Sequence, residues 1–282
     1  MMGDELMDLA RRAELAEAEQ LARTGSPGRG AAREIGGGLV VWKGPGSSYN
    51  SAFGLGLAGP VSAAELDAVE AHLSAGPVRI EVAAPAHPSL LAELARRGYR
   101  LERQLLVWCI AADRGAAAHP EAWSGSGAGS FTDGVAVRPI RDGEEQAWVE
   151  VFARAFLGRP PGAAAEEASL LSVTSSPGGT CFAALAGGRI LGVGVASVHR
   201  GMATLSGAGV LPEHRGRGLQ LALVRARLGW AASHGADLAS ATTAAGTPSQ
   251  RTLEKAGFRC AYPKAVLVRE PGAARASGVG AV

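Results

Sequence analysis

The stretch that decides the fold is Gly209-Val-Leu-Pro-Glu-His-Arg-Gly-Arg-Gly-Leu-Gln-Leu-Ala-Leu-Val224. An apolar run ends at Val210, a short turn contains Pro212, and Arg215-Gly-Arg-Gly218 then opens an apolar helical pattern. Glycines let the backbone curl tightly and leave its N–H groups uncovered. At a helix N-terminus, those free donors and the helix dipole attract an anion. The stretch therefore predicts a strand, a turn and a helix that hold a phosphate or diphosphate. A glycine-rich turn that merely starts a helix is the alternative.

Two other phosphate-binding motifs are absent from this stretch. A dinucleotide-binding turn needs G-x-G-x-x-G, and a P-loop ends in G-K-S or G-K-T. Neither pattern occurs between residues 209 and 224. The turn therefore belongs to neither of these two classes of phosphate-binding motif.

The stretch resembles motif A of the GNAT (GCN5-related N-acetyltransferase) family, which is written Q/R-x-x-G-x-G/A. Arg215 and Gly218 match that motif, and Gln220 stands where it has Gly or Ala. Downstream, Ser249-Gln-Arg-Thr-Leu-Glu-Lys-Ala-Gly-Phe258 resembles motif B, whose helix ends in Gly-Phe. Two motifs in the right order are far more specific than either alone. The resemblance covers residues 135–270.

The resemblance implies an α+β fold with a mixed central sheet flanked by helices. It also implies acetyl-CoA as the acyl donor, and it implies no metal. Backbone groups of Gly209 and Val210 would meet the pantetheine arm. Main-chain N–H groups would bind the pyrophosphate from Arg215, Gly216, Arg217, Gly218, Leu219 and Gln220.

The implied activity is transfer of an acetyl or other acyl group from CoA to a primary amine of a small molecule or peptide. In many family members, a motif B Tyr protonates the departing thiolate. Leu253 stands at that position here and cannot donate a proton. Tyr262 and Ser249 are candidate replacements, and water is a third. The missing Tyr also keeps two other functions open, a non-catalytic acyl-CoA-binding regulatory module and an interaction scaffold.

A proton acceptor is also needed, because an ammonium must lose its proton to a carboxylate, a histidine or a water chain. Glu213 is one candidate, and His199 and His214 also lie near the ends of the predicted strand 203–210. A solvated loop residue is the alternative interpretation of each. Orienting the amine and the thioester can by itself supply a large part of the rate.

The first half looks like a degenerate copy of the same domain. Residues 90–97, 98–99 and 105–108 follow the order helix, glycine plus aromatic, strand, and residues 249–256, 257–258 and 266–268 repeat it. Chance is the alternative explanation. The first half has no Arg-x-x-Gly-x-Gly/Ala match between a strand and a helix, so we expect no cofactor site there. The predicted division is a degenerate GNAT-like domain at 1–112, a linker rich in Gly, Ser and Ala at 113–134, an acetyl-CoA-binding domain at 135–270 and a flexible tail at 271–282.

Hydrophobic periodicity predicts the elements of each half. The first half has helical patterns at 6–22, 63–73 and 88–97, and strand patterns at 39–42, 52–57, 78–82 and 105–110. The second half has strand patterns at 135–140, 181–185, 189–198, 203–210, 238–241 and 266–269, and helical patterns at 144–156, 163–173, 219–233 and 249–256. Trp148, Phe152 and Phe156 share one helix face, which is either a core stripe or a wall of the acceptor pocket.

Composition argues against several classes of protein. The 28 basic and 26 acidic residues give a net charge of +2, so we expect no nucleic-acid partner. The three Cys (109, 181 and 260) lack CxxC spacing, which argues against disulfides and zinc. No run reaches the ~18 apolar residues that span a bilayer, and the N-terminus does not resemble a signal peptide. We therefore expect a cytoplasmic protein with no membrane partner. The resemblance is compatible with a homodimer.

Overall fold

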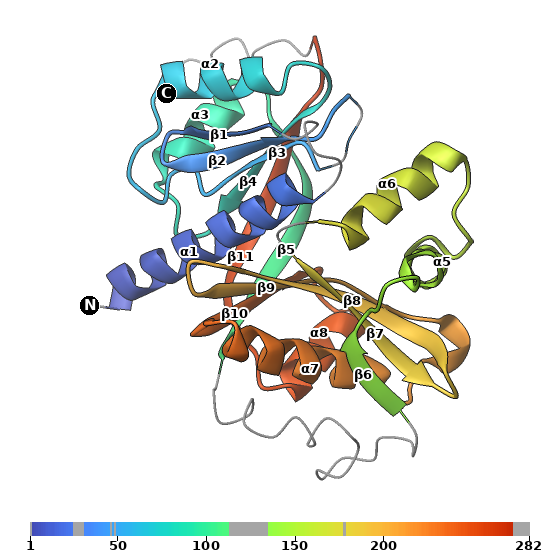
Figure 1. The fold of residues 1–282 in the computed structure, drawn as a ribbon. Coiled ribbons are helices and arrows are strands. Elements are labelled where there is room, and N and C mark those ends of the chain that lie inside the picture. The colour runs from blue at the N-terminus through green and yellow to red at the C-terminus, as the bar shows by residue number, and fades with distance from the viewer. Residues whose placement is uncertain are drawn as a thin grey trace.

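The computed structural model describes residues 2–24, 31–45, 47, 49–112, 135–176 and 179–272. Helices and strands alternate in both halves of the chain (Figure 1). The first half contains α1 (Met2–Arg23), β1 (Ala31–Ile35), β2 (Gly38–Trp42), β3 (Ser51–Phe53), α2 (Ala63–His72), β4 (Val78–Ala83), α3 (Ser89–Arg96) and β5 (Arg100–Ala111). The second half contains β6 (Val135–Pro139), α5 (Glu145–Leu157), α6 (Ala164–Thr174), β7 (Thr180–Ala186), β8 (Arg189–His199), β9 (Met202–Val210), the 3-10 turn η2 (Pro212–His214), α7 (Leu219–Ser233), β10 (Leu238–Thr243), α8 (Pro248–Lys255) and β11 (Arg259–Arg269).

These strands form one 11-stranded mixed sheet in the order β1-β2-β3-β4-β11-β5-β10-β9-β8-β7-β6. The β3–β4 and β9–β10 pairs are parallel, and the other neighbours are antiparallel. The last strand of each half crosses into the other half, since β11 pairs with β4 and β5 pairs with β10. Figure 1 shows β11, in red, running through the middle of the molecule beside β5. The two halves are therefore joined by exchanged strands.

The junctions that lead into the exchanged strands have the same geometry. After α3, the N–H groups of Gly98 and Tyr99 donate to carbonyls three and five residues back, each at 3.0 Å. After α8, the N–H groups of Gly257 and Phe258 make the same two bonds at 3.0 Å. Both glycines have positive φ, +80° and +94°, which a residue with a Cβ adopts only with strain. The structure thus places the two similar segments at equivalent positions.

Helices cover both faces of the sheet. On β2, Leu39 and Val41 pack in a cluster with Ala18 of α1, whereas Val40 packs in the cluster that contains Leu66 of α2. Because side chains alternate along a strand, α1 and α2 lie on opposite faces. In the second half, α5 lies against Gly207 of β9 on the face that α1 covers, and α7 lies on the other face.

The predicted mixed sheet with flanking helices is confirmed, and most element boundaries fall within a few residues of the prediction. Strand β1 is not predicted, because Arg33 and Glu34 interrupt its apolar pattern at the edge of the sheet. The strand predicted at 52–57 ends at Phe53, because Gly54 and Gly56 adopt positive φ.

Strands β5 and β11 begin at Arg100 and Arg259, several residues before the predicted starts. Their first residues are largely exposed, so the chain there lacks an apolar signal, and the two strands pair with each other instead. The predicted linker 113–134 and most of the predicted tail lie outside the described residues. The division into domains remains a prediction. Among the described residues, no helix combines the length and apolar character that crossing a bilayer requires.

Candidate functional site

Strands β9 and β10 separate partway along their length. Their parallel pairing covers only Met202–Thr204 and Leu238–Ser240, although β9 continues to Val210 and β10 to Thr243. A cleft of about 130 Å³ opens between the separated ends. Its walls come from five elements, namely α5 (Phe156), β9 (residues 205–208), α7 (Gln220, Val224 and Arg227), β10 (residues 241–243) and α8 (Ser249, Thr252 and Leu253).

Glycines in β9 shape this cleft. The β8–β9 register shifts between Val193 and Val195, and Gly207 has φ +54° at the irregularity. A Cβ at Gly207 would come within 3.4 Å of Phe152, and one at Gly209 would come within 2.9 Å of Phe156. Helix α5 therefore packs directly on the β9 backbone, which only glycine permits.

The N-terminus of α7 opens beside the end of β9. Its N-cap is Gly218, with φ +79° and no side-chain cap hydrogen bond, and its first turn contains no acidic residue. The first N–H groups of the helix therefore lack a side-chain partner, and the helix dipole adds positive potential. The structure brings Gly209 and Val210, at the end of β9, to the same end of the cleft as residues 215–220.

The side chains of the motif have different roles. The guanidinium of Arg215 donates to the carbonyls of Val210 (3.1 Å) and Ala155 (3.2 Å), which ties β9 to α5. Arg217 is exposed, with Nη1 3.5 Å from Nδ1 of His214. Gln220 lines the cleft and donates weakly to the carbonyl of Ala208 at 3.4 Å. Of the two arginines, Arg217 is the one whose charge remains available to an anion.

The N-terminus of the equivalent helix in the first half is already capped. Helix α2 connects the parallel pair β3–β4, as α7 connects β9–β10. Ser62 caps α2, with its hydroxyl accepting from the N–H of Glu65, and the Glu65 carboxylate accepts from the N–H and hydroxyl of Ser62. These hydrogen bonds hold the pKa of Glu65 below its usual value. A carboxylate of the chain itself thus occupies the anion-binding end of α2.

The three predicted catalytic residues lie in different surroundings. Ser249 lines the cleft. Glu213 is exposed and pairs with Arg154 at 3.2 Å. Tyr262 is 2% exposed on β11, and its hydroxyl donates to Oε1 of Glu14 at 2.9 Å. Burial raises the pKa of Tyr262 far above its usual value. Only Ser249 of the three lies in the cleft wall, where it is exposed and Leu253 is buried.

The aromatic stripe of α5 runs from the core to the cleft, and its part in binding an acceptor stays a prediction. Trp148 is fully buried and donates to the carbonyl of Phe182 at 2.9 Å. Phe152 stacks between Trp148 and Phe156, with ring centroids 5.3 and 4.6 Å away. Phe156 is 51% exposed and lines the cleft. The stripe therefore begins in the core and ends at the candidate site.

A buried ionic cluster lies beneath α1, and the sequence patterns did not predict it. The ammonium of Lys264 lies 2.7 Å from Glu17, 2.8 Å from Glu81 and 3.4 Å from Glu14. Burial raises the pKa of Glu14 to about 7, while Lys264 lowers it. The three carboxylates lie close enough to hold a metal ion, but Lys264 already supplies a cation among them. The sequence signal is weak, because Lys264 lies just before the apolar run at 265–268.

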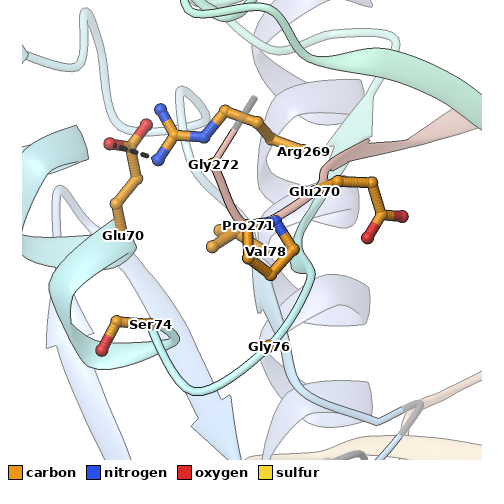
Figure 2. A pocket seen from close by; sticks show the side chains of 8 residues that line it. All are labelled: Glu70, Ser74, Gly76, Val78, Arg269, Glu270, Pro271 and Gly272. Atoms are coloured by element: carbon orange, nitrogen blue, oxygen red, sulfur yellow. Dashed lines mark ion pairs between the residues drawn. The ribbon is translucent and has the colours of Figure 1, made fainter. Parts of the chain in front are cut away.

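A second cavity, of about 350 Å³, lies in the first half, where α2 meets the end of β11 (Figure 2). Figure 2 shows Glu70 and Arg269 pointing toward each other, and their ion pair measures 2.9 Å. Glu70 also pairs with Arg97 at 3.3 Å and accepts from the Tyr99 hydroxyl at 3.3 Å. These charges compensate one another, so the cavity offers less binding chemistry than the cleft at α7.

Comparisons with known proteins agree with this geometry. The model of the Acetyltransferase (GNAT) family matches residues 145–258. A GCN5-related N-acetyltransferase from Kribbella flavida has a similar structure, with TM-score 0.65, 18% identity and coverage of 94% of this chain and 96% of that one. A tandem GNAT protein from the clavulanic acid biosynthesis pathway gives TM-score 0.60 at 17% identity over 96% of each chain.

A third structure, a GCN5-related N-acetyltransferase from Sphaerobacter thermophilus, gives TM-score 0.57 at 21% identity and covers 83% of this chain and 73% of that one. No curated protein sequence matches the chain. The likeness to the tandem protein extends over both halves, so the chain has a tandem GNAT fold. The family-model match covers the half that contains the cleft.

Proposed function

The chain contains a domain of the GNAT acetyltransferase family at residues 145–258, and from this we propose that it transfers an acyl group from CoA to a primary amine. The observation that carries the proposal is the open N-terminus of α7 at the mouth of the β9–β10 cleft. The N–H groups of residues 215–220 would bind the pyrophosphate, and the backbone at Gly209 and Val210 would meet the pantetheine arm.

The cleft supports this reaction because its walls come from both faces of the sheet. Val224 and Leu253 contribute from the α7–α8 face, and Phe156 contributes from the α5 face. An acyl-CoA lying along α7 would therefore present its thioester to an amine arriving on the face of α1 and α5. Holding the two reactants in this way removes much of the entropic barrier.

The transfer itself balances without a further reagent. The amine nitrogen forms a bond to the thioester carbonyl carbon, the carbon–sulfur bond breaks, and CoA leaves as a thiolate. One proton leaves the nitrogen and one is taken up by sulfur. Ser249 is the candidate in the cleft for the second step, and the departing thiolate can also take its proton from water.

Glu17 is a candidate for accepting the amine proton. Its side chain is 23% exposed, and its Oε2 accepts from the ammonium of Lys264 at 2.7 Å and from the hydroxyl of Thr242, which lines the cleft, at 3.3 Å. Glu213 is less well placed, because its side chain is 50% exposed and its partner, Arg154, does not line the cleft. Tyr262 is bonded to Glu14 beneath α1, so its hydroxyl is already engaged.

The first test is calorimetric titration of the purified chain with acetyl-CoA, followed by a panel of primary amines in a free-thiol release assay. Saturable binding followed by amine-dependent thiol release supports the proposal. Absence of acetyl-CoA binding would contradict it and would favour an interaction scaffold.

A second candidate function is a regulatory module that binds acyl-CoA without turnover. Leu253 favours it, because an apolar side chain lines the cleft where many family members have a proton donor. Binding without turnover of any amine in the panel is the result this alternative predicts.

A further inference from the structure

Arg227 is a fully buried cation in the wall of the cleft. It lies on α7, with Val224 and Gln220 one and two turns closer to the helix N-terminus, and all three residues line the cleft. The side chain is 1% exposed. At 1.5 Å per residue, Arg227 lies about 12 Å along the helix from Leu219. Of the α7 residues that line the cleft, Arg227 is the one farthest along the helix from the anion-binding N-terminus.

The partners of this guanidinium are neutral. Its Nε donates to the carbonyl of Leu223 at 2.9 Å, and Nη1 donates to the carbonyls of Val195 and Ser206, each at 3.1 Å. None of the described carboxylates pairs with it, and burial alone lowers its pKa to about 9. Burying a cation without a paired anion is destabilising, because the charge loses its hydration.

The absence of a side chain at Gly194 leaves space for the guanidinium of Arg227. A Cβ on Gly194 of β8 would lie 3.0–3.1 Å from Cζ, Nε and Nη1 of Arg227, so a side chain there would displace the guanidinium. The buried neighbours of Arg227 on α7 include Leu223, Val224 and Ala226. An apolar residue at 227 would continue that pattern, and such replacements of buried ions are often neutral or stabilising.

We propose that Arg227 recognises a carboxylate at the far end of the acyl group, so that the preferred donor is the CoA thioester of a dicarboxylic acid, such as succinyl-CoA. The inference rests on the proposed acyl transfer. The pyrophosphate would lie at the start of α7 and the acyl carboxylate at Arg227, with the pantetheine arm between them. A carboxylate there would compensate the buried charge, and charge-assisted hydrogen bonds are about twice as strong as neutral ones.

The test compares succinyl-CoA with butyryl-CoA, whose acyl groups have the same number of carbons and differ in the terminal carboxylate. Calorimetry on the full chain should give a Kd for succinyl-CoA that is lower by about tenfold or more, the range of a hydrogen bond to a charged group. Arg227→Gln should reduce the ratio of the two Kd values to about one, since the amide carries no charge. Arg227→Lys should retain part of the preference.

Arg225→Gln is the matched control, because Arg225 has an exposed side chain two positions away on α7 and should leave the ratio unchanged. Equal affinities of the unchanged protein for the two esters would overturn the proposal, whether or not the variants fold. A preference that survives Arg227→Gln would also overturn it. Failure to bind acetyl-CoA, butyryl-CoA and succinyl-CoA alike would instead refute the proposed function, and the inference with it.

Discussion

The hydroxyl of Thr242, in the wall of the cleft, lies 3.3 Å from Oε2 of Glu17 on the N-terminal helix α1. The two residues are 225 positions apart in the sequence. Helix α1 is held against the second half by an ion pair between Arg12 and Asp237 and by the bond from the Ser176 hydroxyl to the carbonyl of Arg23. The first half thus places a carboxylate against Thr242, a wall residue of the cleft in the second half.

Replacement of Glu17 should separate binding from turnover. With Glu17→Gln, we expect acetyl-CoA affinity to stay within about twofold and amine turnover to fall by about 10²-fold or more, the range for a lost general base. Glu19→Gln is the control, because Glu19 lies on the same helix and pairs with Arg23 at 3.0 Å. The measurement is the pH dependence of kcat/KM for an amine turned over by the unchanged protein. If Glu17→Gln keeps the wild-type rate and profile, Glu17 is not the proton acceptor.

A negative charge at the start of α7 should strongly weaken acetyl-CoA binding. Gly218→Asp would introduce a negative charge where the pyrophosphate is proposed to bind, and we expect acetyl-CoA affinity to fall by at least about 100-fold, as for a lost charge-assisted contact. Gly235→Asp is a matched control, because Gly235 lies just after the same helix and also has positive φ, at +85° against +79°. Both variants should lose thermal stability because of their positive φ, and Gly235→Asp should lose more because its charge lies at the negative end of the helix dipole. Equal affinity of the two variants would locate the phosphate site elsewhere.

The two motif arginines should respond differently to the same substitution. Arg215→Gln removes a donor that bonds the carbonyls of Val210 and Ala155, so we expect a loss of about 1–3 kcal/mol in the free energy of unfolding. Arg217→Gln should leave stability unchanged, weaken acetyl-CoA binding severalfold and reduce its dependence on ionic strength. Denaturant melts and calorimetry at two salt concentrations check both. Identical profiles for the two variants would contradict this division of roles.

The sequence predicted the segments where local pattern and local chemistry agree. The turn at residues 215–218 could be predicted because glycines, arginines and a following apolar helix all point to an anion site. The exchange of β5 and β11 could not, because antiparallel pairing between distant strands leaves no local pattern and the paired ends are exposed. For a related reason, Glu17 and Arg227, whose roles are proposed here, were not singled out from the sequence. Each is one polar residue in a helical pattern, and its role depends on partners far away in sequence.

Because helix α2 of the first half is capped, we expect one acetyl-CoA site per chain. Because the Glu65 carboxylate occupies the N-terminus of α2, calorimetry should give a single acetyl-CoA site per chain. Ser62→Ala should lower the free energy of unfolding by about 1 kcal/mol, the usual cost of a lost N-cap. It should change neither the stoichiometry nor the affinity. Two sites of similar affinity would mean that the first half binds the cofactor despite its cap.

The buried carboxyl of Glu14 should make stability depend on pH in a defined direction. Its pKa is raised from 4.5 to about 7, chiefly by burial and despite the opposing charge of Lys264. Between these two values the folded protein retains a proton that the unfolded chain has released. The free energy of unfolding therefore falls as pH rises through this window, and the stabilisation is fully present only below it. Glu81, whose pKa is also raised by burial, contributes with the same sign.

The measurement is the thermal midpoint of the unchanged protein and of Glu14→Gln from about pH 5 to about pH 8, where one pKa unit corresponds to about 1.4 kcal/mol. His199 titrates with the opposite sign, because burial lowers its pKa, so the difference between the two proteins is the informative quantity. Relative to Glu14→Gln, the unchanged protein should lose a few degrees across this range, as expected for a chain of this size. Glu5→Gln, on an exposed turn of the same helix, should behave like the unchanged protein. If Glu14→Gln shows the same slope as the unchanged protein, the carboxyl of Glu14 is ionised in the folded state and Lys264 outweighs its burial.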